Sequence, residues 1–142
     1  MPHLFALLIL SLSLQANLVD SQSWERSRSV AESQHEIVML LIRGKAFDKV
    51  LRASQEIFSL RFPYNQEHLF VTEGQILSGA LYDHQQYELA QALLDQALRA
   101  VNSNNSKALL YKEKAYLCKQ EGKTDEAMEL FEKAVELEKS AP

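Results

Sequence analysis

The stretch Tyr111–Lys139 reads YKEKAYLCKQEGKTDEAMELFEKAVELEK, and it decides the fold of the chain. It contains two runs with apolar residues at helical spacing, and Gly122 separates them. A glycine at such a place ends a helix with a tight turn. Thr124 can cap the next helix, and Asp125 and Glu126 favour its start through the helix dipole. The stretch therefore predicts two consecutive helices joined by a short turn.

Four further amphipathic runs precede this stretch, and each ends near residues that interrupt helices. These boundaries are Gly44, Pro63, Tyr82–His84 and the polar string Asn102–Ser106. Ser29 is followed by a glutamate three residues later, so a capping box predicts that the first of these helices begins there. The chain has only 4 Gly and 3 Pro in 142 residues and is rich in Leu, Ala, Glu, Gln and Lys. These residues are good helix formers, so the sequence predicts an all-α fold of six helices.

The final pair of runs resembles a repeat of the tetratricopeptide family. That family places a bulky and a small residue on its first helix, and then Ala, an aromatic and Ala on its second. The matching residues here are Tyr111, Ala115, Gly122, Ala127, Phe131 and Ala134. The sequence departs from the family pattern at Lys114, Cys118 and Lys139. The resemblance implies two helices that cross closely at Ala115.

The two earlier pairs of runs match the same pattern less closely. The middle pair matches at Leu77, Ser78, Leu81, Tyr87, Ala90, Leu94 and Ala97, and the first pair matches only in its apolar pattern. Ala90 follows Val50 by 40 residues and Ala127 follows Ala90 by 37, against about 34 in the family. The extra residues fall in loops, where insertions are tolerated. The resemblance implies three antiparallel helix pairs within residues 22–142, stacked as a short right-handed α-solenoid.

The N-terminal residues 1–21 have the character of a signal peptide. Leu4–Leu14 reads LFALLILSLSL, an uncharged run that is too short to span a bilayer, which takes about 20 residues. Small residues at Val19-Asp20-Ser21 predict cleavage after Ser21, with cleavage after Ala16 as the second choice. We therefore expect a secreted or periplasmic protein with no membrane span after removal of the signal. The basic leader typical of signals is missing, so the alternatives are an uncleaved helix at the membrane surface or an apolar helix packed on the domain.

The composition argues against several classes of function. The formal charge is −4 and no cluster of Lys and Arg occurs, so we expect no nucleic-acid partner. Cys118 is the only cysteine and is expected to be a small buried apolar side chain, and the four histidines are dispersed, so no metal is expected. No P-loop, dinucleotide fingerprint or metalloprotease motif occurs, so we expect neither a cofactor nor an enzymatic activity.

The resemblance also implies where a partner would bind. In the family the first helix of each pair lines a concave face. The partner-binding residues expected on that face are His35, Met39, Gln75, Tyr82, Lys112, Tyr116 and Lys119, with Glu32, Ile42, Thr72, Gly79 and Leu109 beside them. Aromatic residues are common binding hot spots, and lysines suit a carboxylate. The expected function is a non-enzymatic adaptor that holds a peptide or helix of a protein partner.

The last predicted helix carries a second candidate surface. No further predicted helix covers its apolar residues, which are Met128, Val135 and Leu137. We expect a second copy in a two-fold homodimer, or the partner, to cover them. Alternatively, the helix tilts inward and leaves only scattered apolar atoms. The alternative function is therefore a self-associating structural subunit of an envelope or extracellular assembly.

Overall fold

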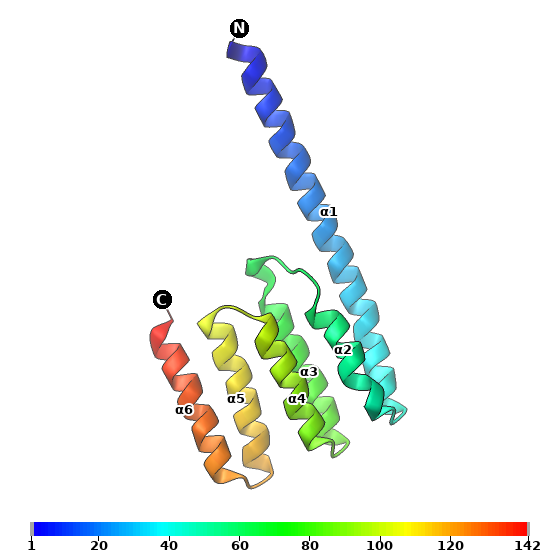
Figure 1. The fold of residues 1–142 in the computed structure, drawn as a ribbon, viewed down its shortest axis with the longest axis vertical. Helices are drawn as coiled ribbons and strands as arrows, with labels where there is room; N and C mark the ends of the chain where they lie inside the picture. The colour runs from blue at the N-terminus through cyan, green and yellow to red at the C-terminus, as the bar shows by residue number, and fades with distance from the viewer. Residues whose placement is uncertain (1, 142) are drawn as a thin grey trace.

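The computed structural model describes the backbone of residues 2–141 and the side chains of residues 22–141. The prediction of an all-helical fold with six packed helices is confirmed, because 84% of the chain is helical and the described residues contain no strand. The helices are α1 (Pro2–Arg43), α2 (Val50–Phe58), α3 (His68–Asp83), α4 (Tyr87–Ala100), α5 (Asn104–Gln120) and α6 (Thr124–Ser140) (Figure 1). Two short 3-10 helices, η1 (Phe47–Lys49) and η2 (Tyr64–Gln66), precede α2 and α3.

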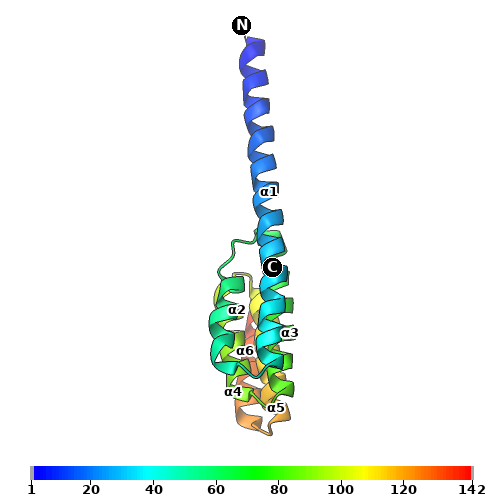
Figure 2. The ribbon, with the colours of Figure 1, turned by 90° about the vertical axis from the view of Figure 1, so that its right-hand side faces the viewer.

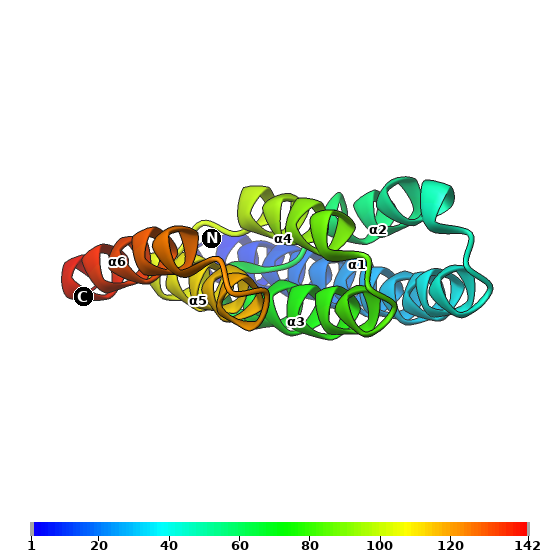
Figure 3. The ribbon, with the colours of Figure 1, turned by 90° about the horizontal axis from the view of Figure 1, so that it is seen from below.

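The helices lie in two rows. Figure 3 shows α1, α3 and α5 in one row and α2 and α4 in the other, with α6 beside α5. Each helix of the pairs α1–α2, α3–α4 and α5–α6 contacts its mate, and neighbouring pairs touch through α1–α3, α2–α4, α3–α5 and α4–α5. The pairs therefore follow one another in chain order. The N-terminal part of α1 extends well beyond the body (Figures 1 and 2).

The turn inside each pair has the same geometry. Its central residue has a positive φ, and these residues are Lys45 (60°), Gln85 (60°) and Gly122 (76°). In each turn the next amide donates to the carbonyl five residues back, which gives Ala46 to Leu41 at 2.8 Å, Gln86 to Leu81 at 2.9 Å and Lys123 to Cys118 at 2.9 Å. Together with a second bond from the positive-φ residue to the carbonyl three residues back, this is the Schellman motif. The turns recur after 40 and 37 residues, the same offsets that relate the three pairs in the sequence.

Three expectations about helix ends are wrong. α1 does not begin at Ser29 but runs from Pro2 to Arg43, because no Gly or Pro interrupts it and a helix extends more easily than it starts. Gly44 directly follows the last residue of α1, as predicted, and the residue with positive φ is the next one, Lys45. Thr124 is the first residue of α6 and does not cap it. α5 also begins inside the string expected to be a loop, where the Ser103 hydroxyl accepts a hydrogen bond from the Ser106 amide at 3.1 Å.

The core lies between the two rows and is mainly aliphatic. The largest buried side chains include Ile57, Leu77, Leu81, Leu93, Leu94 and Leu110. Cys118 is buried, as predicted. The one buried polar pair that joins α2 to α4 is satisfied, because the Ser54 hydroxyl donates to Gln96 Oε1 at 2.5 Å and the Gln96 amide donates to the Leu51 carbonyl at 2.8 Å.

Gly74 lies where α3, α4 and α5 meet. A β-carbon at this position would lie 3.1 Å from the Ala97 β-carbon and 3.2 Å from a methyl group of Leu110. Both distances are shorter than an ordinary van der Waals contact, and the β-carbon of Ala97 is fixed to the backbone of α4. Glycine at this position therefore sets the separation of the three helices.

We predict opposite effects for two alanine substitutions in α3. Gly74→Ala should lower the free energy of unfolding by about 1 kcal/mol, because overpacking outweighs the gain in helix propensity. Gly79→Ala, where an added β-carbon meets nothing within 4 Å, should raise it by about 0.5–1 kcal/mol. Urea denaturation followed by circular dichroism measures both. A Gly74→Ala protein as stable as Gly79→Ala would contradict the close packing.

A second pair of substitutions tests the turns. Gln85→Gly should raise the free energy of unfolding by up to about 1 kcal/mol, because a residue with a β-carbon is strained at positive φ. Gly122→Ala should lower it by about 1 kcal/mol for the same reason. Thermal denaturation of the two variants beside the wild type gives both signs. Lys45→Gly serves as an independent repeat of the first change, and a loss of stability in both glycine variants would refute the assigned turn geometry.

Candidate functional site

One face of the protein is formed by α1, α3 and α5 on the side away from α2 and α4 (Figure 3). We call it the front face. On α3, Thr72, Gln75, Ile76 and Gly79 follow one another at helical spacing and share this side. On α5, the residues at the same spacing are Leu109, Lys112, Tyr116 and Lys119. Three large apolar side chains, Ile76, Leu109 and Tyr116, are exposed.

The expected partner-binding residues differ in their exposure to solvent and in their contacts with other side chains. Tyr116 and Lys119 are exposed, whereas Gln75, Tyr82 and Lys112 are half-buried. Lys112 forms an ion pair with Glu138 of α6, and the ring of Tyr82 lies 4.6 Å from that of Tyr87.

On α1 the expectations hold less well. Met39 is half-buried against the core, and His35 is engaged with α3. The expectation that Ile42 lines the face is wrong: Ile42 is buried, because it lies four residues after Val38 on the core side of α1.

The front face contains a hollow of about 330 Å³ between α1 and α3. Its apolar lining includes Ile57, Phe62, Leu69 and Phe70, and Arg28, Glu32 and Glu36 lie at it. Inside it, His35 Nδ1 lies 2.6 Å from Glu73 Oε1. The rings of Phe62 and Phe70 are stacked with centroids 4.3 Å apart, and Trp24 packs edge-on against Phe62 at 4.9 Å. Sequence patterns missed Glu73 and Phe62. The packing of α1 on α3 brings Glu73 to His35, and Phe62 lies in the α2–α3 connection, where its ring stacks on Phe70.

Glu73 on α3 and Glu67, the residue just before α3, have pKa values shifted in opposite directions. Burial raises the pKa of Glu73, and the hydrogen bond and charge of His35 oppose that rise only in part. Burial acts in the same direction on Glu67, but hydrogen bonds from the backbone of Ser103 and Asn102 and from the hydroxyls of Ser106 and Ser103 keep its pKa below the ordinary value. The Ser103 amide donates to Glu67 Oε1 at 2.9 Å, which joins the α2–α3 connection to the α4–α5 connection.

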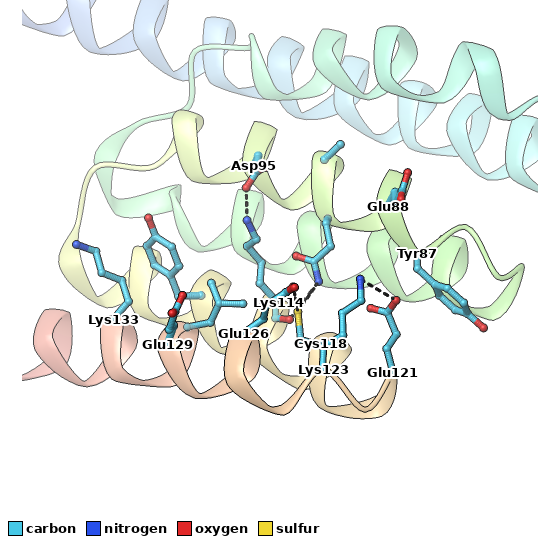
Figure 4. Close-up of a pocket in the computed structure, with 14 residues that line it drawn as sticks. Tyr87, Glu88, Asp95, Lys114, Cys118, Glu121, Lys123, Glu126, Glu129 and Lys133 are labelled. Atoms are coloured by element: carbon cyan, nitrogen blue, oxygen red, sulfur yellow. Dashed lines mark hydrogen bonds and ion pairs between the residues drawn. The ribbon is translucent and has the colours of Figure 1, made fainter.

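A larger, polar hollow of about 610 Å³ lies between α4 and α6 over α5 (Figure 4). Lys114 crosses it to pair with Asp95, and Gln91 Nε2 donates to the Lys114 carbonyl at 3.2 Å. Burial, with the charges of Glu126 and Glu121, raises the pKa of the Cys118 thiol. The thiol is therefore not activated as a nucleophile. Among the described residues, no group of three His, Cys, Asp or Glu side chains is placed to hold a metal ion.

A third, apolar hollow of about 530 Å³ lies along α6 and the end of α5, and we call it the end hollow. Its lining includes Lys119, Met128, Phe131, Glu132 and Val135. Met128 and Val135 are exposed, and no other described helix covers them. Leu137, which the sequence groups with them, is half-buried and lines a separate hollow of about 410 Å³ with Lys133 and Lys139.

No known protein family, no curated protein and no solved structure matches the chain. Within residues 22–141, no helix is long and apolar enough to cross a membrane.

The two shifted glutamates predict opposite pH effects. Ionised Glu67 stabilises the fold above its ordinary pKa of 4.5, and this contribution is lost as the pH falls through its lowered pKa. Glu67→Gln should therefore be less stable than the wild type at pH 7. Ionised Glu73 carries a burial cost that disappears as the pH falls through a pKa raised above 4.5, so Glu73→Gln should be more stable at pH 7. Both differences should shrink in acid, measured by urea denaturation from pH 7 to pH 3. Differences that do not change with pH would contradict the assigned shifts.

Proposed function

We propose that this protein is a non-enzymatic adaptor that binds a peptide or a helix of another protein across the front face. The observation that carries the proposal is the exposure of Ile76, Leu109 and Tyr116 on two neighbouring helices of that face. Exposed apolar side chains grouped on one side of a small protein are typical of interaction sites. Tyr116 is held edge-on against Phe131 at 5.1 Å, so it offers a preordered aromatic anchor.

We also propose that the chain is a tetratricopeptide-like repeat protein, a short right-handed solenoid of three helix pairs. Three turns with the same hydrogen bonds, at the offsets that relate the pairs in the sequence, support this proposal. In such a stack the front face is the concave one, so His35, Met39, Gln75, Tyr82, Lys112, Tyr116 and Lys119 would line the groove.

Charge and shape suggest how a partner would lie. Lys119 is exposed beside Tyr116 and suits a carboxylate of the partner, whereas Lys112 already has a carboxylate, that of Glu138. The hollow between α1 and α3, with its aromatic lining, suits one apolar side chain. The N-terminal apolar run supports action in a secreted or periplasmic compartment, or at a membrane surface if the run is retained.

The end hollow favours a second candidate function, a self-associating structural subunit. Its apolar residues form one continuous lining and are not scattered singly over the surface, and Met128 is more than half exposed. The two surfaces meet at Lys119, but Ile76 belongs to the front face alone and Met128 to the end hollow alone, so variants at these two residues test the functions separately.

A peptide selection tests the adaptor proposal. Random 12-residue peptides displayed on phage are selected on the wild-type protein, and their affinity is measured by calorimetry. Replacing both Ile76 and Tyr116 (Ile76→Ser with Tyr116→Ala) should weaken binding by about 2 kcal/mol or more, roughly thirtyfold, because hot-spot residues dominate such interfaces.

Tyr64→Ala is the control, because Tyr64 is 72% exposed in the α2–α3 connection and does not line the hollow between α1 and α3. It should bind the selected peptides as the wild type does. No enriched peptide, or equal affinity in the double variant with unchanged circular dichroism, would reject the proposal.

A further inference from the structure

We infer that copies of this protein join head to tail, with α1 of one copy packed into the end hollow of the next. The inference rests on the second candidate function, self-association, and names its surfaces and its symmetry. It follows from comparing the two ends of the stack with the joints inside it.

The first end is the outer side of α1, which carries Val30 and Ile37. Each of these two side chains is 47% exposed. The 40-residue offset between the first two turns relates Val30 to Phe70 and Ile37 to Leu77 on α3. Phe70 is only 4% exposed and Leu77 is fully buried. The two positions are therefore apolar on both helices, but they are buried on α3 and exposed on α1.

The second end of the protein is α6. The contact between α4 and α5 inside the chain shows how a further helix could pack on it. On α4, Gln91 donates to the Lys114 carbonyl and lies 3.6 Å from Cys118 Sγ, and Asp95 pairs with Lys114. The 37-residue offset relates Gln91 to Met128 and Asp95 to Glu132. Both Met128 and Glu132 line the end hollow. On α4, the positions of Gln91 and Asp95 contact α5. The corresponding positions on α6 have no further described helix packed against them.

In the proposed contact, α1 of one copy packs on α6 of the next copy in the way that α5 packs on α4 within one chain. The residues of α1 that correspond to Lys114 and Cys118 of α5 are Ile37 and Leu41. Met128, in the place of Gln91, would then meet Ile37 and Leu41. The Gln91 contact of the joint within the chain thus becomes an apolar contact between chains, whereas Glu132 keeps the carboxylate of Asp95 without the lysine that pairs with it.

The charges on α6 argue against the two-fold dimer expected from the sequence. Glu132 and Glu136 flank the apolar residues of α6, and both are exposed. In a two-fold pairing each α6 would face its own carboxylates, because the same patch meets itself. Ile37, Leu40 and Ser33 on the outer side of α1 carry no negative charge. Exposed Glu36 lies beside Ile37 and one turn from Leu40, so a head-to-tail contact reduces this repulsion without removing it.

Complementation between two variants of the full chain tests the inference. Ile37→Glu removes the α1 end and Met128→Glu removes the α6 end. The wild type should form species whose mass grows with concentration in sedimentation velocity, because an open head-to-tail assembly keeps one free surface at each end. Each variant alone should be monomeric, with affinity reduced about tenfold or more by the buried charge. An equimolar mixture should form a one-to-one dimer, because each variant keeps one intact end.

Ile76→Glu is the matched control, since Ile76 has the same 47% exposure as Ile37 but lies on the front face. It should associate as the wild type does while losing the selected peptides, and Ile37→Glu should keep those peptides. Failure of the joint and failure of the adaptor function are thus distinguishable.

Three results would overturn the inference: a wild type that stays monomeric at all concentrations, an Ile37→Glu variant that still dimerises, or a mixture that forms no dimer. Circular dichroism checks the fold of each variant, and Leu40→Glu and Val135→Glu replace any variant that loses its helix content.

Discussion

The close approach of three helices at Gly74 is the constraint on which the rest of the structure depends. A helix pair exposes on each side apolar positions that only a neighbouring pair can cover. Gly74 brings α3 within contact of Ala97 on α4 and of Leu110 on α5, so the middle pair and the last pair share one core. The Ser54–Gln96 hydrogen bond makes the corresponding link between α2 and α4. The position of the front face follows, because these contacts, together with the packing of α1 on α2 and α3, place α1, α3 and α5 in one row.

Much of the fold could be predicted from the sequence, because helix formers, apolar spacing and breakers such as Pro63 act locally. The predictions of helix ends were wrong where a local sequence signal was overridden by the longer helix or turn around it. The capping box at Ser29 has the right residues, but an uninterrupted helix already runs through it. The first two turns hold Lys45 and Gln85 where glycine is the usual signal, so the sequence does not reveal that the three turns share one geometry.

The candidate sites were harder to predict for a physical reason. Helical spacing shows which residues share a side, but packing decides which side is covered. Ile42 and Tyr116 both fitted the pattern of a groove, yet one is buried and the other exposed. The His35–Glu73 contact joins residues 38 positions apart and depends on how α1 lies against α3. In the sequence Lys114 is only a departure from a family pattern, whereas in the structure it joins α5 to α4 through its ion pair with Asp95.

The three like turns also bear on how the chain acquires and loses its structure. Each turn is closed by hydrogen bonds between residues only three to five apart, so a helix pair can form before distant segments meet. In the proposed solenoid each pair touches only its neighbours, so opening should begin at the two ends. The α3–α4 pair has a neighbour on both sides, so its amides should be the last to exchange with solvent. Cooperativity in this protein therefore resides in the joints between pairs, and strengthening a joint should do more for whole-molecule stability than strengthening any single helix.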